Sequence, residues 1–217
     1  MVDTDTDSGN TAEASTSPKL QSDAIPKEPR EQPVAIGINR GFVLPRDCAV
    51  TIVPAGHTAV LKEGDRVTVL QALGGTATVT TSDGEMARLS PQDSIDFGFV
   101  EAAPASTAVD TGAPFSVDAV WEAATTVFDP EIPVDIVELG LVYRVEAGEL
   151  PDGTWLVDID MSVTAPFCGM GDILRQDLHD AVAALPGVST VNVALVFDPP
   201  WDVSRMSNVA RLELGMM

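Results

Sequence analysis

The stretch Thr164-Ala-Pro-Phe-Cys168-Gly-Met-Gly-Asp172 places one cysteine between two different hydrophobic periodicities. Residues 155–162 alternate apolar and polar side chains, which is typical of a half-buried strand, and apolar groups recur at helical spacing after Gly171. Pro166, Gly169 and Gly171 indicate a loop between these two segments. The stretch therefore predicts a strand, a loop (the cysteine loop, residues 164–171) and a helix whose N-terminus lies beside Cys168.

Cys168 is the first candidate for chemistry. The N–H groups and the dipole of a helix N-terminus favour thiolate over thiol, and a thiolate binds metal or attacks an electrophile. Asp172 opposes this effect and Arg175 is the one cation nearby, so we expect moderate activation. The alternative is a small, buried and inert cysteine; the glycines and proline of the loop favour a reactive thiol.

The pattern around the cysteine loop predicts an α-β-β-α-β domain. Ser116 is placed to cap a helix with one apolar stripe, and Pro186-Gly187 ends the helix after the loop. The expected order is helix, strand, strand, helix, strand and a short terminal helix, at residues 116–128, 136–145, 155–162, 173–185, 188–197 and 206–214. We expect residues 116–217 to form a two-layer domain with a hairpin joining its first two strands.

The preceding part of the chain predicts a second, smaller domain. Short alternating runs separated by turn signals indicate a β-rich barrel or sandwich over residues 32–101, with strands at residues 49–53, 58–62, 66–73 and 76–81. Residues 1–31 have the composition of a disordered tail, and residues 102–115 that of a linker. The predicted fold class is α+β.

The composition excludes several classes of partner. The net charge is −21, and from Ser116 onward 17 acidic residues stand against four arginines and no lysine, so nucleic acid and anionic membranes are unfavourable partners. No apolar run approaches the roughly 20 residues of a spanning helix. The first residues lack a secretory signal, and the two cysteines, Cys48 and Cys168, are interpreted as thiols in a reducing cytoplasm.

The remaining candidate ligands do not form a familiar site. His179 lies eleven positions after Cys168, about 16 Å along one helix, and His57 belongs to the other domain, which argues against a Cys–His hydrolase or a zinc site. Gly74-Gly75 lacks the Gly-Lys-Ser/Thr of a P-loop, so no nucleotide is expected. A lone thiolate can bind iron when a second chain of a homodimer or a small thiol supplies the other ligands.

Asp129-Pro-Glu-Ile-Pro133 (the acidic-proline loop) is the second candidate segment. Its prolines predict a rigid connection between helix and strand. On spacing alone we favour a simple connector with solvated carboxylates over a functional surface.

Three motifs together resemble the SufT family of iron-sulfur cluster assembly: Phe128-Asp-Pro-Glu-Ile-Pro133 with Glu138-Leu-Gly-Leu-Val142, the cysteine loop, and Phe197-Asp-Pro-Pro-Trp201. Val53-Pro-Ala-Gly56 and the segments 71–75 and 87–89 are similar to the family's β-rich N-terminal region. Phe167, where glycine is usual, and His57, where a hydroxyl residue is usual, depart from the pattern.

The resemblance implies an auxiliary, non-enzymatic factor that works beside the SUF proteins to place clusters into apo-proteins. It assigns the functional thiol, and a transient iron-sulfur ligand, to Cys168. It places a supporting surface at Asp129, Pro130, Glu131, Pro133, Thr164, Pro166 and Gly169.

Two other functions remain open from the residues. A thiol enzyme would use Cys168 as nucleophile, with the Gly169 or Met170 N–H stabilising an oxyanion. A purely protein-binding module would use the β-rich domain and keep Cys168 as a structural residue.

Overall fold

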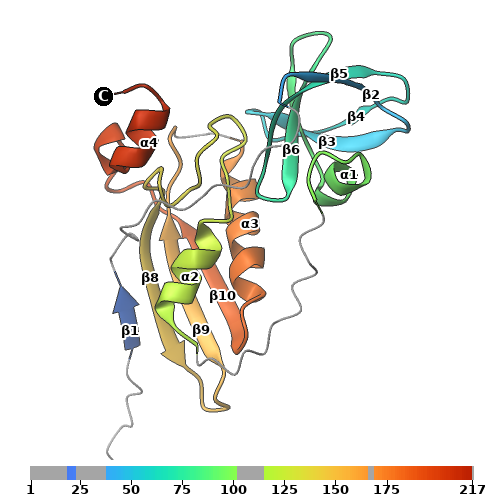
Figure 1. Ribbon diagram of the computed structural model, residues 1–217. Helices are drawn as coiled ribbons and strands as arrows, with labels where there is room; N and C mark the ends of the chain where they lie inside the picture. The colour runs from blue at the N-terminus through green and yellow to red at the C-terminus, as the bar shows by residue number, and fades with distance from the viewer. Residues whose placement is uncertain (1–18, 23–37, 102–114, 166–168, 217) are drawn as a thin grey trace, which may run out of the picture.

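The computed structural model describes residues 19–22, 38–101, 115–165 and 169–216. Two units are seen in Figure 1: the β unit (residues 38–101) and the α/β unit (residues 115–216), whose sheet also includes β1 (Lys19–Ser22). The predicted α+β class is confirmed. The predicted linker at residues 102–115 lies outside the described residues except for its last position.

The β unit is one antiparallel sheet of six strands in the order β2-β5-β6-β7-β3-β4. The strands are β2 (Arg40–Val43), β3 (Cys48–Val53), β4 (Thr58–Leu61), β5 (Arg66–Leu73), β6 (Thr76–Thr81) and β7 (Met86–Leu89). Val67 and Val69 of β5 are buried in the core of the unit and alternate with the half-buried Thr68 and Leu70, as period-two alternation requires. A register shift between Val69 and Gln71 then ends this alternation, so that Ala72 rather than Gln71 joins the core. The described pairings leave β2 and β4 as edge strands, so closure into a barrel or sandwich stays a prediction.

Three elements of the β unit were missed in the sequence: β2, β7 and helix α1 (Pro91–Asp96). Both strands have four residues, too few for a clear alternation. The helix did carry a signal, because the Ser90 hydroxyl caps the Asp93 N–H at 3.0 Å and Pro91 occupies the first turn.

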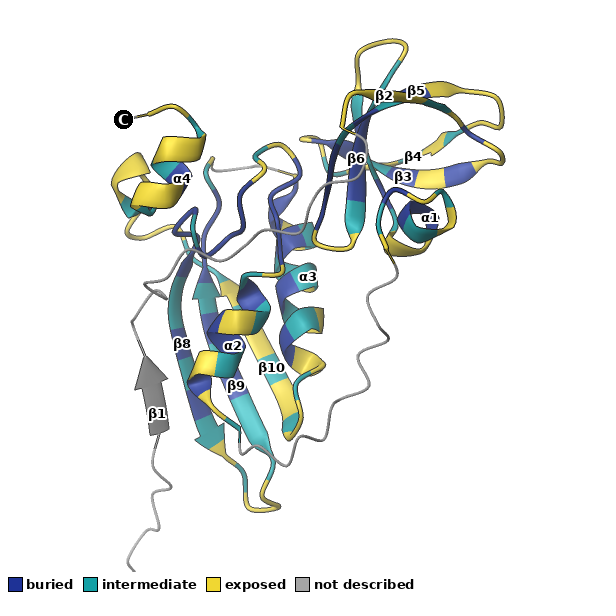
Figure 2. Ribbon diagram, viewed as in Figure 1, coloured by how far each residue is buried: buried dark blue, intermediate teal, exposed yellow. Residues whose placement is uncertain are grey.

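The α/β unit has the predicted order α2 (Val117–Ala124), β8 (Val142–Glu149), β9 (Trp155–Met161), α3 (Gly171–Ala183) and β10 (Val188–Leu195). β8 and β9 form the expected antiparallel hairpin, and α3 is the crossover that lets β10 pair parallel to β9. α2 and α3 lie together on one face of the sheet, with their exposed residues turned away from it (Figure 2). The core between the layers includes Val120, Ile159, Leu174, Leu178 and Val182.

Two predicted boundaries in the α/β unit were wrong. The helix expected at residues 116–128 ends at Ala124, and the strand expected from residue 136 begins at Val142. Residues 136–141 form a buried turn because the Asp135 carboxylate accepts hydrogen bonds from the N–H groups of Val137 and Glu138, both at 2.9 Å. In the predicted tail, Lys19–Ser22 forms β1 against β8; the rest of the tail lies outside the described residues.

The C-terminal segment packs on its own unit. It contains the 3-10 helix η1 (Val203–Arg205) and α4 (Asn208–Glu213), close to the terminal helix expected at residues 206–214. The Trp201 indole donates to the Leu139 carbonyl at 2.9 Å, and the Ser207 N–H donates to the Glu138 carbonyl at 2.9 Å. The Phe-Asp-Pro-Pro-Trp motif is thus tied to the turn that follows the acidic-proline loop.

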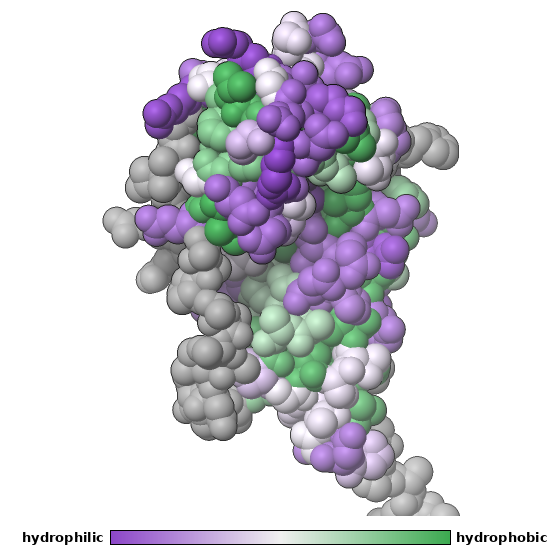
Figure 3. Space-filling view, turned by 90° about the vertical axis from the view of Figure 1, so that its right-hand side faces the viewer, coloured by the Kyte–Doolittle hydropathy of each residue, from purple (hydrophilic) through white to green (hydrophobic). Residues whose placement is uncertain are grey.

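No helix among the described residues has the length and apolar content needed to cross a membrane. Figure 3 views the side of the molecule that carries the β unit, and on it hydrophilic side chains are interspersed with hydrophobic patches.

Candidate functional site

The cysteine loop begins and ends at described residues, although Pro166, Phe167 and Cys168 themselves lie outside them. Thr164, half-buried, follows the end of β9, and exposed Gly169 comes two residues before α3. Ser162, which directly follows β9, is held in place because its N–H donates to the Leu141 carbonyl at 2.8 Å. The predicted strand before the thiol and the predicted helix after it are therefore confirmed.

The first turn of α3 lies directly after Gly169. Met170 is buried and its carbonyl accepts the Leu174 N–H at 2.9 Å, while its side chain makes no capping hydrogen bond. A Cβ on Gly171 would lie 3.2 Å from the Val163 side chain, so the glycine permits close packing of the helix start on the strand end. Asp172 pairs at the surface with Arg175 at 3.3 Å, which leaves that cation engaged with the carboxylate that opposes a thiolate.

The acidic-proline loop is built around Asp129, which is buried rather than solvated. Its carboxylate accepts the N–H groups of Glu131 at 2.8 Å and Ile132 at 3.0 Å, an arrangement that closes a turn. Pro130 is also buried, whereas Glu131 and Pro133 are exposed. The preferred interpretation of this segment, a connector with solvated carboxylates, was wrong for Asp129.

The two carboxylates of this loop are electrostatically perturbed. Burial raises the pKa of Asp129, against the lowering effect of its two backbone hydrogen bonds and of Arg88. Burial and the nearby Asp129 raise the pKa of Glu131. The loop therefore binds protons more readily than two free carboxylates would.

The β unit contacts both candidate loops, which the sequence did not reveal. The Gln71 side chain donates to the Asp129 carbonyl at 2.9 Å in a buried position. A Cβ on Gly56 would overlap the backbone of Gly169, and one on Gly74 would lie 2.8 Å from the Thr126 carbonyl. A glutamine within the otherwise apolar run of residues 69–73 was the available signal, although it names no partner.

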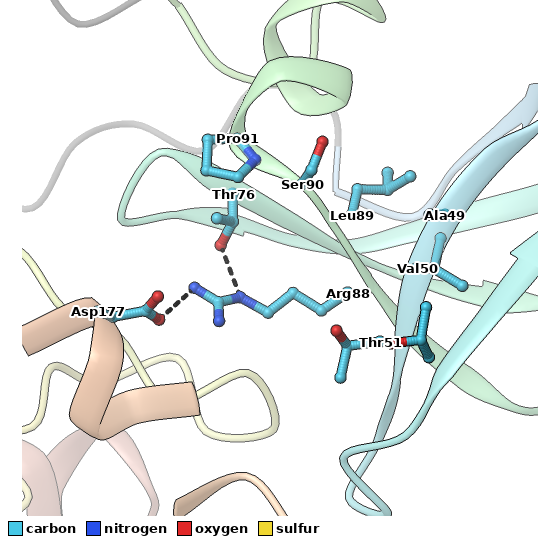
Figure 4. A pocket seen from close by; sticks show the side chains of 10 residues that line it. Ala49, Val50, Thr51, Thr76, Arg88, Leu89, Ser90, Pro91 and Asp177 are labelled. Atoms are coloured by element: carbon cyan, nitrogen blue, oxygen red, sulfur yellow. Dashed lines mark hydrogen bonds and ion pairs between the residues drawn. The ribbon is translucent and has the colours of Figure 1, made fainter. Parts of the chain in front are cut away.

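An ion pair also joins the units. Arg88 of β7 reaches Asp177 of α3 at 2.6 Å, and its Nε donates to the Thr76 hydroxyl at 3.2 Å (Figure 4). A cavity of about 210 Å³ lies beside this pair, lined mostly by the β unit. Burial raises the pKa of Asp177 despite the opposing effect of Arg88.

The other candidate ligands lie apart from these loops or are engaged elsewhere. Cys48 is 4% exposed in the core of the β unit, where burial raises the pKa of its thiol. His179 Nδ1 lies 3.0 Å from a carboxylate oxygen of Asp180, and His57 is exposed in the turn after β3. In the described part of the chain, no three or more His, Cys, Asp or Glu side chains gather as a metal site.

Comparison with known proteins decides the family. The model of the iron-sulfur cluster assembly protein family matches residues 117–194, which include both candidate loops. A Fe-S protein maturation auxiliary factor from Porphyromonas gingivalis is 42% identical over 92 residues, which are 42% of this chain and 84% of the relative. The chain belongs to the iron-sulfur cluster assembly protein family.

Two other known proteins are similar over slightly less than half of the chain. The Fe-S protein maturation auxiliary factor SufT from Staphylococcus aureus is 36% identical over 90 residues, 42% of this chain and 98% of the relative. A solved domain of unknown function from Bacillus anthracis is 33% identical, with a TM-score of 0.40, and covers 46% of this chain and 92% of that one. The resemblance inferred from the motifs is confirmed, and the family match leaves the β unit outside it.

Proposed function

We propose that this protein is an auxiliary maturation factor that helps place iron-sulfur clusters into apo-proteins and catalyses no reaction of its own. The observation that carries the proposal is the family match over residues 117–194, which spans the cysteine loop and the acidic-proline loop. Its relatives bear the name of maturation auxiliary factors. The cluster is cargo in this function, passed on to a recipient protein.

Cys168 is the residue that meets the cargo or the client. In the sequence it is bonded to Gly169, which comes just before helix α3. The Met170 side chain does not cap the backbone N–H groups at the start of this helix, and uncapped N–H groups of this kind favour a thiolate. One thiolate leaves the other iron positions to a second chain of a homodimer, a small thiol or the client, and such open ligation suits transfer.

The contact surface in this proposal combines Cys168 with Thr164, Pro166, Gly169 and the acidic-proline loop. Asp129 and Pro130 are buried and hold this loop in shape, while Glu131 and Pro133 are exposed. We assign the first pair to positioning and the second pair to contact with partners. The partners are SUF cluster-assembly proteins and apo iron-sulfur clients of the cytoplasm.

The test compares the two cysteines. A strain whose only copy carries Cys168→Ser should lose activity of its cluster-dependent enzymes to the level of the deletion, because serine is a poor iron ligand in place of a thiolate. Cys48→Ala is the matched control, since Cys48 is buried in the other unit and should leave maturation intact. Normal maturation with Cys168→Ser, at normal protein abundance, would exclude the thiol from the function.

Reconstitution then separates a carrier from an adaptor. The full chain and Cys168→Ser are incubated anaerobically with iron and sulfide, and absorption, iron content and subunit mass are recorded. Cluster on the parent alone, especially in a dimer, supports a carrier with Cys168 as ligand. Turnover of a thioester or amide that alkylation blocks would instead support the thiol enzyme.

A further inference from the structure

The β unit touches three segments of the α/β unit that are far apart in the sequence. Gln71 and Gly74 meet residues 126–129, Gly56 meets Gly169, and Arg88 meets Asp177 on α3. These contacts come from the turn after β3, from β5 with the turn that follows it, and from β7. One end of the β unit is therefore seated on the side of the α/β unit that carries both candidate loops (Figure 1).

The contact at Gly56 is between two main chains. A Cβ on Gly56 would overlap the Gly169 carbonyl, and a Cβ on Gly169 would overlap the Ala55 carbonyl, so only glycine at both positions allows this approach. The turn itself is held by the Gly56 N–H donating to the Ile52 carbonyl at 2.7 Å. The β unit thus rests on the residue bonded to Cys168, with no side chain between the two backbones.

Arg88 forms a second contact that holds the β unit against the α/β unit. Its side chain is 11% exposed, its Nε is oriented by the Thr76 hydroxyl, and it reaches the Asp177 carboxylate 2.6 Å away. Figure 4 shows the guanidinium extending from the sheet toward α3. A guanidinium taken out of water requires its partner, because breaking such a pair leaves an uncompensated charge.

We propose that the β unit is a wall of the proposed cluster-handling surface: its turn at residues 54–57 blocks one side of the approach to Gly169, and Arg88 keeps it docked. Partner proteins must then approach from the remaining sides and contact both units. This assigns a role to the unit outside the family match. That this wall borders a cluster-handling surface rests on the proposed function. The contact between the two units is tested without iron or a client protein.

The test uses the full chain and its two cysteines as reporters. A small maleimide and a bulky polyethylene-glycol maleimide label the protein under native conditions, and mass spectrometry gives the rate at each cysteine. Gly56→Ala should raise bulky labelling at Cys168 on the order of tenfold, since labelling through an opened state follows its population. The effect on the small reagent should be weaker, and buried Cys48 should stay slow.

Gly84→Ala is the matched control. Gly84 has φ of +84°, close to the +75° of Gly56, but no described atom lies within 4 Å of its Cβ position. It carries the same backbone strain without the contact, so its labelling rates should match the parent. Equal bulky labelling of Cys168 in the two glycine variants overturns the proposal.

If Gly56→Ala speeds labelling of Cys48 as well, the β unit of that variant has unfolded. Arg88→Gln then provides the test. Faster bulky labelling at Cys168 alone in Arg88→Gln, with recovery in the charge-swapped pair Arg88→Asp and Asp177→Arg, supports the wall. An unchanged rate at Cys168 overturns it. Failure of client maturation with Cys168→Ser has no bearing on these rates, so the two proposals fail separately.

Discussion

Asp129 places a carboxylate in a buried position where two backbone N–H groups hold it. Its pKa is raised because burial outweighs those hydrogen bonds and the effect of Arg88. A carboxyl with a raised pKa in the folded state stabilises the fold below its unfolded pKa, and this contribution is lost as pH rises through the folded pKa. Deprotonation of Asp129 therefore costs the folded state more free energy than the unfolded chain, and it opposes folding.

The change Asp129→Asn tests this electrostatic strain. The asparagine oxygen can still accept both N–H groups but carries no charge, so the free energy of unfolding at neutral pH should rise by on the order of 1 kcal/mol. The gain should shrink as the pH falls, because the parent carboxyl is then protonated. Urea unfolding at neutral and mildly acidic pH measures both effects.

Two further variants serve as comparisons for Asp129→Asn. Asp129→Ala leaves two buried N–H groups without their acceptor and should lose roughly 2 kcal/mol. Asp83→Asn, in an exposed turn, should change little. A loss of stability in Asp129→Asn at neutral pH would show that the carboxylate's hydrogen bonds outweigh its burial.

At the level of elements, α3 supports the cysteine loop. Leu174, Leu178 and Val182 lie on one face of the helix and are buried against the sheet. Leu178→Ala should lower the free energy of unfolding by about 2–5 kcal/mol, through lost burial and the cavity left behind. Gln176→Ala, on the exposed face of the same helix, should change it by less than about 0.5 kcal/mol. Thermal unfolding of both variants measures the difference, and similar losses would contradict the assignment of the buried face.

The elements of the α/β unit were predictable because their periodicities are local. α3 and β9 begin and end within about two residues of the expected positions. Residues 136–141 were misread because an apolar run does not distinguish a strand from a buried turn. The turn depends on the side chain of Asp135, whose hydrogen bonds to the backbone compete with strand pairing.

For the whole molecule, the sequence identified the loops but not what covers them. Cys168 was found from its flanking glycines and the change of periodicity, both local signals. Gln71, Arg88 and Asp177 looked like ordinary polar positions, because their partners lie 58 and 89 residues away along the chain. Contacts between the two units produce no periodic pattern in the sequence, so a single sequence cannot reveal them.

The pair Arg88–Asp177 gives the last prediction, at the scale of the two units. Each single replacement, Arg88→Met or Asp177→Leu, leaves the other charge largely buried and should lose on the order of 2 kcal/mol at neutral pH. The double variant should be close to the parent, because two apolar side chains need no partner. In Arg88→Met the loss should diminish on acidification, since protonation of Asp177, whose pKa burial already raises, removes the unpaired charge. Urea unfolding of the four proteins across pH measures this cycle, and strictly additive losses would mean that the two side chains do not hold the units together.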